Sequence, residues 1–322
     1  MDLTKTGKPL LSIVVPVYNE SDHLCLVLKT IEENAKTIGE AFEIILIDDG
    51  SNDATWEILK VEAQHIANLR AIRLSRNFGK ESAICAGLEM ATGQGIILMD
   101  GDLQHPPELI PQMVSIWRSE NVQVVEAVKK KRSKESVHIR MGSHIFYRFL
   151  RILTGYDLMG ASDFKLLDRK VLDALLAMRE RNVFFRGMST WVGFNKAQVE
   201  FDVQLRVGGK SGWSIRDLVR LAITGITSFS SLPLQMISFA GIVFFGFAVI
   251  LGIQTLYMKI SGRALSGFTT IILLQLIIGS ILMWGLGMIG VYISKIFYEV
   301  KARPRYIIEE SLIVGHKMND HC

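Results

Sequence analysis

Two aspartates separated by one glycine, in the order Asp100-Gly101-Asp102, form the pattern with the clearest chemical meaning in this sequence. In an extended segment, residues i and i+2 point the same way, so both carboxylates would face one spot, and Gln104 has the same parity. Hard anionic oxygens with open positions suit Mg²⁺ or Mn²⁺ holding a diphosphate. The pattern therefore predicts a metal site at Asp100, Asp102 and Gln104, with a solvated Asp-Gly-Asp turn as the alternative.

The elements that must position these residues alternate between strand and helix. Apolar runs predict strands at 11–17, 43–47, 71–74, 96–99 and 122–128, and helical spacing of apolar residues separates them. Such alternation favours an α/β fold with a mostly parallel sheet and helices on both faces. Polar clusters follow four of these strands, at residues 18–20, 48–51, 76–80 and 100–102.

Ligands of open α/β sheets bind beyond the carboxyl ends of the strands, so the four polar clusters predict one shared site. The first turn carries neither the GxGxxG nor the GxxxxGK[ST] pattern, which speaks against a dinucleotide site and against a P-loop. Net charge is only +4 with 21% charged residues, so composition does not point to a nucleic-acid partner.

The C-terminal part of the chain is strongly apolar. Residues 221–258 and 264–294 contain no Asp, Glu, Lys, Arg or His. A membrane span needs about 20 apolar residues, so we expect spans at 234–258 and 268–293, against the alternative of a buried helical hairpin in a soluble core. Residues 213–232 mix apolar and basic residues at helical spacing, as interfacial amphipathic helices do. Residues 141–153 show a similar pattern, which suits either the membrane interface or packing on the core of the domain.

Two spans would place both chain ends on one side of the membrane. The positive-inside rule favours the cytoplasm for that side, because Lys295, Lys301 and Arg303 follow the second span whereas the short loop carries Lys259 and Arg263. The N-terminus shows no signal-peptide pattern. The three cysteines, Cys25, Cys85 and Cys322, form no CxxC pair and are typical of a reducing compartment.

Taken together, these motifs resemble the GT-A glycosyltransferases of family two that use a polyprenyl phosphate as acceptor, a group that includes dolichol-phosphate mannose synthase and the bactoprenol glucosyltransferases. The resemblance spans nearly the whole chain. It is carried by the segments 15–20, 47–55, 75–80, 99–107, 162–169, 180–185, 191–193, 226–233 and 290–304.

The resemblance implies roles for individual residues. Pro16, Tyr18, Glu20 and Asp49 would bind the base and ribose of a nucleotide-sugar donor, with Lys80 and Asp100 also in the donor site; Asp100, Asp102 and Gln104 would surround Mg²⁺ or Mn²⁺. Asp163 would be the candidate base or acceptor-site carboxylate. Arg206 and Lys210 would face phosphate groups.

The implied reaction is the inverting transfer of one sugar, with UDP-glucose as the favoured donor, to undecaprenyl phosphate at the cytoplasmic side of a bacterial inner membrane. Our interpretation divides the chain into a catalytic domain (1–212), a juxtamembrane amphipathic helix (213–232), two transmembrane helices (233–295) and a cytoplasmic tail (296–322). A homo-oligomer is possible. The alternatives are a processive polysaccharide synthase and a non-catalytic membrane scaffold of the same fold. No Gln-x-x-Arg-Trp motif supports the synthase, and the Asp-Gly-Asp motif argues against the scaffold.

Overall fold

The computed structural model describes residues 9–102, 104–129, 162–178, 180, 184–201, 232–262 and 267–313. The chain divides into two compact units. One comprises Met1–Leu218 together with Pro304–Cys322, and the other comprises Val219–Arg303. The larger unit contains the sheet, and the smaller one contains the apolar helices.

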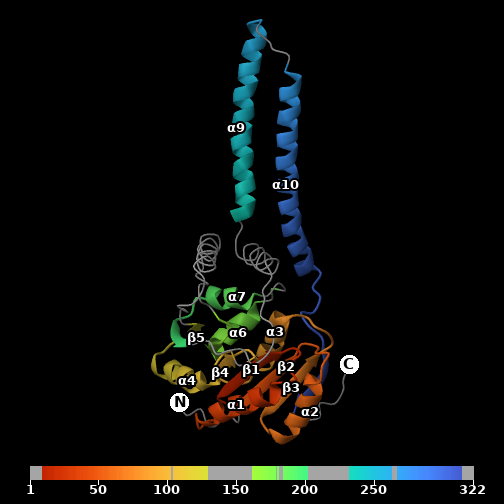
Figure 1. Ribbon diagram of the computed structural model, residues 1–322. Coiled ribbons are helices and arrows are strands. Elements are labelled where there is room, and N and C mark those ends of the chain that lie inside the picture. The colour runs from red at the N-terminus through yellow and green to blue at the C-terminus, as the bar shows by residue number, and fades with distance from the viewer. Residues whose placement is uncertain are drawn as a thin grey trace, which may run out of the picture. The chain divides into compact units, whose positions relative to one another are not determined.

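An eight-stranded sheet forms the centre of the larger unit, in the order β7-β5-β6-β4-β1-β2-β3-β8 (Figure 1). Strands β4, β1, β2 and β3 are parallel, as the sequence predicts. Strand β6 runs antiparallel between β4 and β5, and β7 lies parallel to β5. The bounds are β1 Leu11–Val17, β2 Phe42–Asp48, β3 Leu69–Leu74, β4 Gly95–Leu98, β5 Val124–Lys129, β6 Lys165–Asp168, β7 Lys196–Phe201 and β8 Ile308–Ile313.

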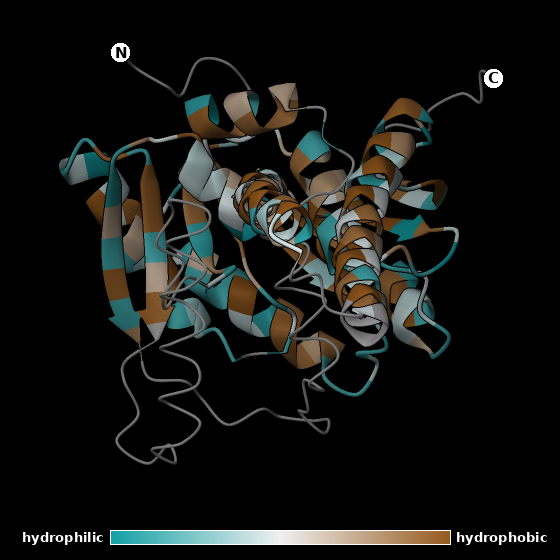
Figure 2. Ribbon diagram, turned by 90° about the horizontal axis from the view of Figure 1, so that it is seen from above, coloured by the Kyte–Doolittle hydropathy of each residue, from teal (hydrophilic) through white to brown (hydrophobic). Residues whose placement is uncertain are grey.

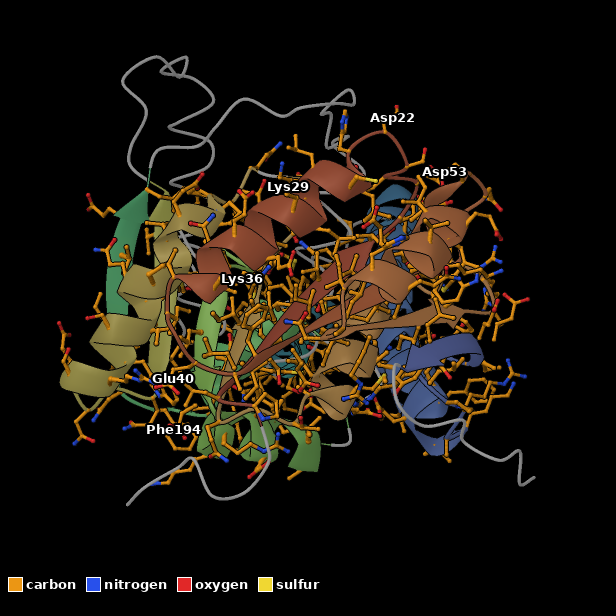
Figure 3. The ribbon with its side chains drawn as sticks, turned by 90° about the horizontal axis from the view of Figure 1, so that it is seen from below. Asp22, Lys29, Lys36, Glu40, Asp53 and Phe194 are labelled. Atoms are coloured by element: carbon orange, nitrogen blue, oxygen red, sulfur yellow. The ribbon has the colours of Figure 1, made fainter. Side chains whose placement is uncertain are left out.

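Helices cover both faces of this sheet, because its central strands are apolar on both sides. Helices α1 (Leu24–Lys36), α2 (Thr55–His65) and α4 (Ile110–Ser119) contribute to one core cluster with alternate residues of β1 and β2. The apolar residues of α1 recur at helical spacing and are buried, whereas Lys29 and Lys36 lie on its outer surface (Figure 3).

Helix α3 (Lys80–Met90) packs on the opposite face of the sheet against β1 and β2. The contact is close at Gly87, where an added Cβ would lie 2.4 Å from Val14 Cγ1 and 2.5 Å from Ile47 Cδ1. Only glycine therefore lets α3 approach the sheet this closely. Helix α6 (Arg169–Ala177) contacts α3, and the short helix α7 (Phe185–Trp191) contacts α6.

The segment after the apolar helices is not a simple tail. Residues 308–313 form β8, which pairs antiparallel with β3 at the edge of the sheet. Its side chains tie it to the domain: Trp56 Nε1 donates to Glu310 Oε2 at 2.7 Å, and the Tyr306 hydroxyl donates to Glu89 Oε2 at 2.6 Å. The chain therefore returns to the larger unit after its second apolar helix.

The smaller unit contains the two helices expected to span a membrane. They are α9 (Leu232–Ile260) and α10 (Phe268–Val300), and both are long and apolar enough to cross a bilayer. Figure 2 shows apolar residues around both. Helix α10 continues beyond residue 293, where we expected the span to end. The amphipathic helix expected at 141–153 lies outside the described residues, and so does the one expected at 213–232 except for Leu232, which begins α9.

Candidate active site

The polar loops of the site meet because β1 and β2 end side by side. Val17 lies opposite Asp48 in the parallel register. Beyond these residues the Asn19 amide donates to Ser51 Oγ at 2.9 Å, and the Glu20 amide donates to Thr55 Oγ1 at 3.0 Å. These hydrogen bonds join the two loops at the carboxyl edge of the sheet, where ligand sites are expected.

A cavity of about 280 Å³ opens at this edge. It is lined by residues from four strand ends and from the start of α3: Pro16, Val17, Tyr18, Glu20, Asp49, Asn77, Gly79, Lys80, Ala83, Asp100, Gly101 and Asp102. All residues that the sequence assigns to the donor site lie in this lining. Of the three predicted metal-site residues, Asp100 and Asp102 line the cavity, whereas Gln104 is not among the lining residues.

Asp49 organises the wall formed by the loop before α3. Its Oδ1 accepts a hydrogen bond from the Phe78 amide at 2.8 Å, and its Oδ2 accepts one from the Gly79 amide at 2.9 Å. Burial nevertheless raises the pKa of Asp49, since these hydrogen bonds oppose but do not outweigh it. Asp49 thus fixes the shape of the cavity, besides the donor contact expected for it.

Asp100 and Asp102 reach one cavity through a turn rather than through strand alternation. Strand β4 ends at Leu98, and the Gln104 amide donates to Asp102 Oδ1 at 3.1 Å. An added Cβ at Gly101 would lie 2.8 Å from Val17 Cγ1, so glycine lets this turn lie against β1. The alternation of side chains in an extended strand therefore does not continue beyond the end of β4. This explains why Gln104 does not line the cavity with the two aspartates.

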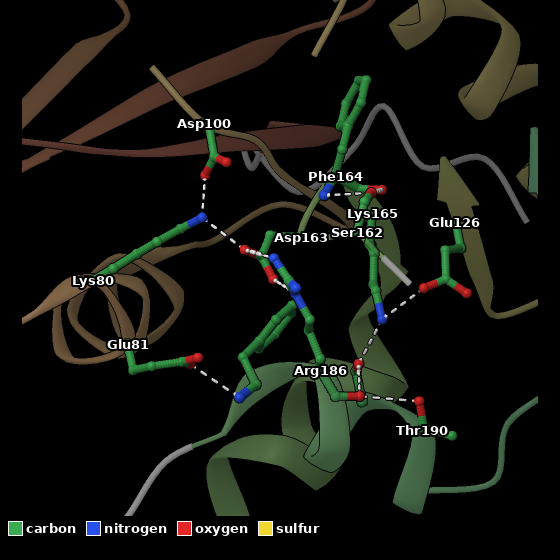
Figure 4. Close-up of polar contacts among 12 residues, drawn as sticks. Lys80, Glu81, Asp100, Glu126, Ser162, Asp163, Phe164, Lys165, Arg186 and Thr190 are labelled. Atoms are coloured by element: carbon green, nitrogen blue, oxygen red, sulfur yellow. Dashed lines mark hydrogen bonds and ion pairs between the residues drawn. The ribbon is translucent and has the colours of Figure 1, made fainter. Parts of the chain in front are cut away.

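A chain of charged side chains extends from the cavity to α7 (Figure 4). Lys80 Nζ lies 2.5 Å from Asp100 Oδ1 and 2.6 Å from Asp163 Oδ2. Arg186 donates two hydrogen bonds to the same Asp163 carboxylate, from Nε to Oδ1 at 2.7 Å and from a second nitrogen to Oδ2 at 2.9 Å. Two cations from different helices therefore meet at Asp163, which precedes β6.

These contacts set the charge of the cluster. Burial alone would raise the pKa of Asp163, but the hydrogen bonds and positive charges of Arg186 and Lys80 outweigh burial and hold that pKa well below its usual range. Burial alone would lower the pKa of Lys80, but Asp100 and Asp163 raise it. Asp163 is thus ionised and Lys80 protonated across the physiological range.

The two aspartates of the cavity fit a hard divalent cation by the chemistry of their donor atoms. Within the described part of the chain, no three His, Cys, Asp or Glu side chains gather into a larger metal-binding group. Asp100 and Asp102 would supply part of a coordination shell and leave positions for the phosphate oxygens of a donor and for water. Lys80 already holds one oxygen of Asp100.

Sequence reasoning missed Arg186, whereas Asn77 lines the cavity as part of the polar cluster 76–80 that was expected at this edge. Arg186 lies 23 residues after Asp163, and no spacing signal linked the two. The predicted phosphate-facing residues Arg206 and Lys210 lie outside the described residues.

A family model described as glycosyl transferase family 2 matches residues 12–176, which include the cavity and Asp163. The chain belongs to glycosyl transferase family 2. The match confirms the resemblance and the expected GT-A-like α/β fold, and it identifies the protein as a glycosyltransferase.

Relatives of this glycosyltransferase match it over almost their full length. The uncharacterized glycosyltransferase YkcC of Bacillus subtilis is 37% identical over 308 residues, which are 95% of each chain. The prophage bactoprenol glucosyl transferase homolog of Escherichia coli is 36% identical and covers 93% of this chain and 98% of its own. The bactoprenol glucosyl transferase of Shigella phage SfX is 34% identical with the same coverage.

Proposed function

We propose that this glycosyltransferase transfers one sugar, with inversion, from a nucleotide-diphosphate donor to the phosphate of a membrane polyprenol. The observation that carries the proposal is the cavity at the carboxyl edge of the sheet, where Asp100, Asp102 and Lys80 meet. The relatives named bactoprenol glucosyl transferases support undecaprenyl phosphate as acceptor and UDP-glucose as donor, because they match over nearly the whole chain.

In this proposal Pro16, Tyr18, Glu20 and Asp49 bind the nucleoside end of the donor, and Lys80 lies near its diphosphate. Asp100 and Asp102 would hold Mg²⁺ or Mn²⁺. Such an ion would neutralise the charge that develops on the departing nucleoside diphosphate. Arg206 and Lys210 are proposed to face the acceptor phosphate, although they lie outside the described residues.

The nucleophile would be an oxygen of the acceptor phosphate. A phosphate monoester has its second pKa near 6 and is mostly dianionic at pH 7, so it needs little deprotonation. Asp163 is a weak base, because Arg186 and Lys80 hold its pKa well below the usual range. We therefore assign Asp163 the task of orienting Lys80 and Arg186, which we propose face the acceptor phosphate together with Arg206 and Lys210, Lys80 from its place beside the donor diphosphate.

The protein would act in a bacterial inner membrane, with α9 and α10 as spans and the cavity on the cytoplasmic side. Nucleotide sugars would then reach the cavity from the cytoplasm and the lipid phosphate from the membrane surface. Support comes from the length and hydropathy of the two helices and from the basic residues that follow α10.

The decisive experiment is a radiolabel transfer assay with the purified full-length protein, undecaprenyl phosphate, Mn²⁺ or Mg²⁺, and a panel of UDP- and GDP-sugars. We expect label to enter the lipid from UDP-glucose, with loss of transfer in EDTA and at least about a 100-fold decrease in Asp102→Ala.

The matched control is Asp173→Ala, which removes an exposed aspartate that pairs with Arg169 on α6, and which should retain full activity. Transfer from a donor other than UDP-glucose would correct the sugar but keep the reaction. Absence of both transfer and nucleotide binding would contradict the proposed function.

A further inference from the structure

Glu81 is a partly buried carboxyl group next to Lys80 in the first turn of α3. Its Oε2 accepts a hydrogen bond from the backbone amide of Phe185 at 3.0 Å (Figure 4). Phe185 is the first residue of α7, and Phe184 before it makes no side-chain cap. Glu81 therefore supplies an acceptor for an amide at the start of α7, where helical partners are missing.

This contact places Arg186 as well, because Arg186 directly follows Phe185. Two neighbouring residues of α3 are thus linked to the same short segment: Lys80 shares the Asp163 carboxylate with Arg186, and Glu81 accepts from the Phe185 amide. Farther along α7, Ser189 Oγ accepts from the buried Lys165 Nζ at 2.8 Å. Among the contacts of the described residues, α7 is therefore held by Glu81 at the Phe185 amide, by Asp163 at Arg186 and by Lys165 at Ser189, and the first two contacts lie at adjacent residues.

The charges around Glu81 are mixed. Lys80 and Cys85 lie on its own helix, Arg186 lies on α7, and Asp163 lies ahead of β6. Burial is the largest influence and raises the pKa of Glu81 to about 7; Asp163 adds to the rise, whereas Lys80 and Arg186 oppose it. Cys85 is neutral in this range, because burial raises the pKa of its thiol to about 11.

The ionisation state of Glu81 matters for any anion that approaches Lys80 and Arg186. A neutral Glu81 adds no charge beside Lys80 and Arg186, which keep their contacts with Asp163. An ionised Glu81 adds a negative charge beside them and repels that anion. In both states a carboxyl oxygen can accept from the Phe185 amide.

We propose that Glu81 is a positioning residue that anchors the start of α7, and with it Arg186, and that its ionisation weakens the binding of the anionic acceptor. Only the effect of Glu81 ionisation on acceptor binding rests on the proposed function. The anchoring of α7 and the titration of Glu81 can be measured without any activity.

The first test compares the thermal stability of wild type and Glu81→Gln from pH 5 to pH 8. The folded state keeps a proton on Glu81 that the unfolded chain loses near the ordinary pKa of about 4.3. The contribution of Glu81 to the free energy of unfolding is therefore complete below the ordinary pKa and decreases as the pH rises to about 7, above which it is lost. We expect Glu81→Gln to gain Tm relative to wild type over this interval. A constant difference in Tm would contradict the titration.

The second test measures KM for undecaprenyl phosphate at the same pH values. We expect the ratio of wild-type to Glu81→Gln KM to rise about fivefold between pH 6 and pH 8. The ionisation of the acceptor phosphate changes KM equally in both proteins, so its effect cancels in this ratio. Glu33→Gln, an exposed change on α1, should follow wild type at every pH.

The third comparison tests anchoring. Glu81→Ala leaves the Phe185 amide without its acceptor, and we expect kcat to fall at least about tenfold below that of Glu81→Gln. Equal kcat in the two variants, or a KM ratio independent of pH, would overturn the inference. A wild-type protein that transfers no sugar would instead overturn the proposed function, while the stability curves would still report on Glu81.

Discussion

Lys80 is the residue that links the two carboxylates at the centre of the site. Its ammonium group contacts Asp100 at the cavity and Asp163 beside α7, while 43% of its side chain is exposed. A divalent cation that binds Asp100 would meet this positive charge within a few ångströms. Lys80 would therefore compete with such an ion for the same oxygen until a donor diphosphate added negative charge.

Replacing Lys80 by methionine should strengthen metal binding in the absence of nucleotide. Two charges about 4 Å apart interact by about 4 kcal/mol at an effective dielectric of 20, so we expect at least about tenfold tighter binding of Mn²⁺ by electron paramagnetic resonance. Lys36→Met, which removes an exposed lysine of α1, is the control. An unchanged Mn²⁺ affinity in Lys80→Met would show that Lys80 does not compete for Asp100.

At the scale of elements, the loops at the strand ends depend on backbone conformations that few residues adopt. Gly50 follows Asp49 with a φ of +67°, and Gly39 follows α1 with a φ of +72°. An added Cβ at Gly50 would lie 2.4 Å from the backbone carbonyl carbon of Arg76, whereas a Cβ at Gly39 meets nothing within 4 Å. The two glycines thus have similar φ angles, but only Gly50 has no room for a side chain.

Gly50→Ala should therefore cost more stability than Gly39→Ala. Both variants strain a left-handed residue by about 1 kcal/mol, and only Gly50→Ala also pushes the loop of Arg76 and Asn77 away from the cavity. We expect Gly50→Ala to lower Tm more and to weaken UDP binding, as measured by calorimetry, while Gly39→Ala binds UDP normally. Equal effects would contradict the close packing of the two loops.

The sequence predicted the strands and helices whose signals are local. Continuous apolar runs located β1 and β2, and the polar residues after them were expected to form one site. It did not predict β8, because Trp56 and Glu310 are 254 residues apart and no local pattern connects them. Arg186 and Glu81 were missed for the same reason: their partners come from other elements, and only the packing of α3 and α7 brings them to Asp163.

At the scale of the whole molecule, the chain leaves the catalytic unit, forms two apolar helices and returns as β8. If α9 and α10 both span the membrane, the residues before and after them must lie on the same side. The turn after α9, which contains Ser261, would then be exposed on the other side. Such a topology would place the catalytic cavity and the turn in different compartments.

Cysteine labelling checks this topology with a native probe. Cys25 is exposed on α1, and Cys85 is buried. In Cys322→Ser, a membrane-impermeant maleimide should label Cys25 in inverted vesicles and not in intact spheroplasts. Adding Ser261→Cys to a variant that lacks Cys25 should reverse the pattern. Labelling of Cys25 in intact spheroplasts would place the cavity outside the cell and contradict the proposed localisation.

The pairing of β8 with β3 also determines the order in which the sheet is completed during synthesis. A ribosome makes β3 early and β8 only after both apolar helices, so β3 remains an unpaired sheet edge during most of synthesis. Such edges are sites of aggregation until they are covered. The sheet becomes complete only after the chain has formed both apolar helices and β8 has paired with β3. If α9 and α10 span a membrane, this last step of folding would follow their insertion.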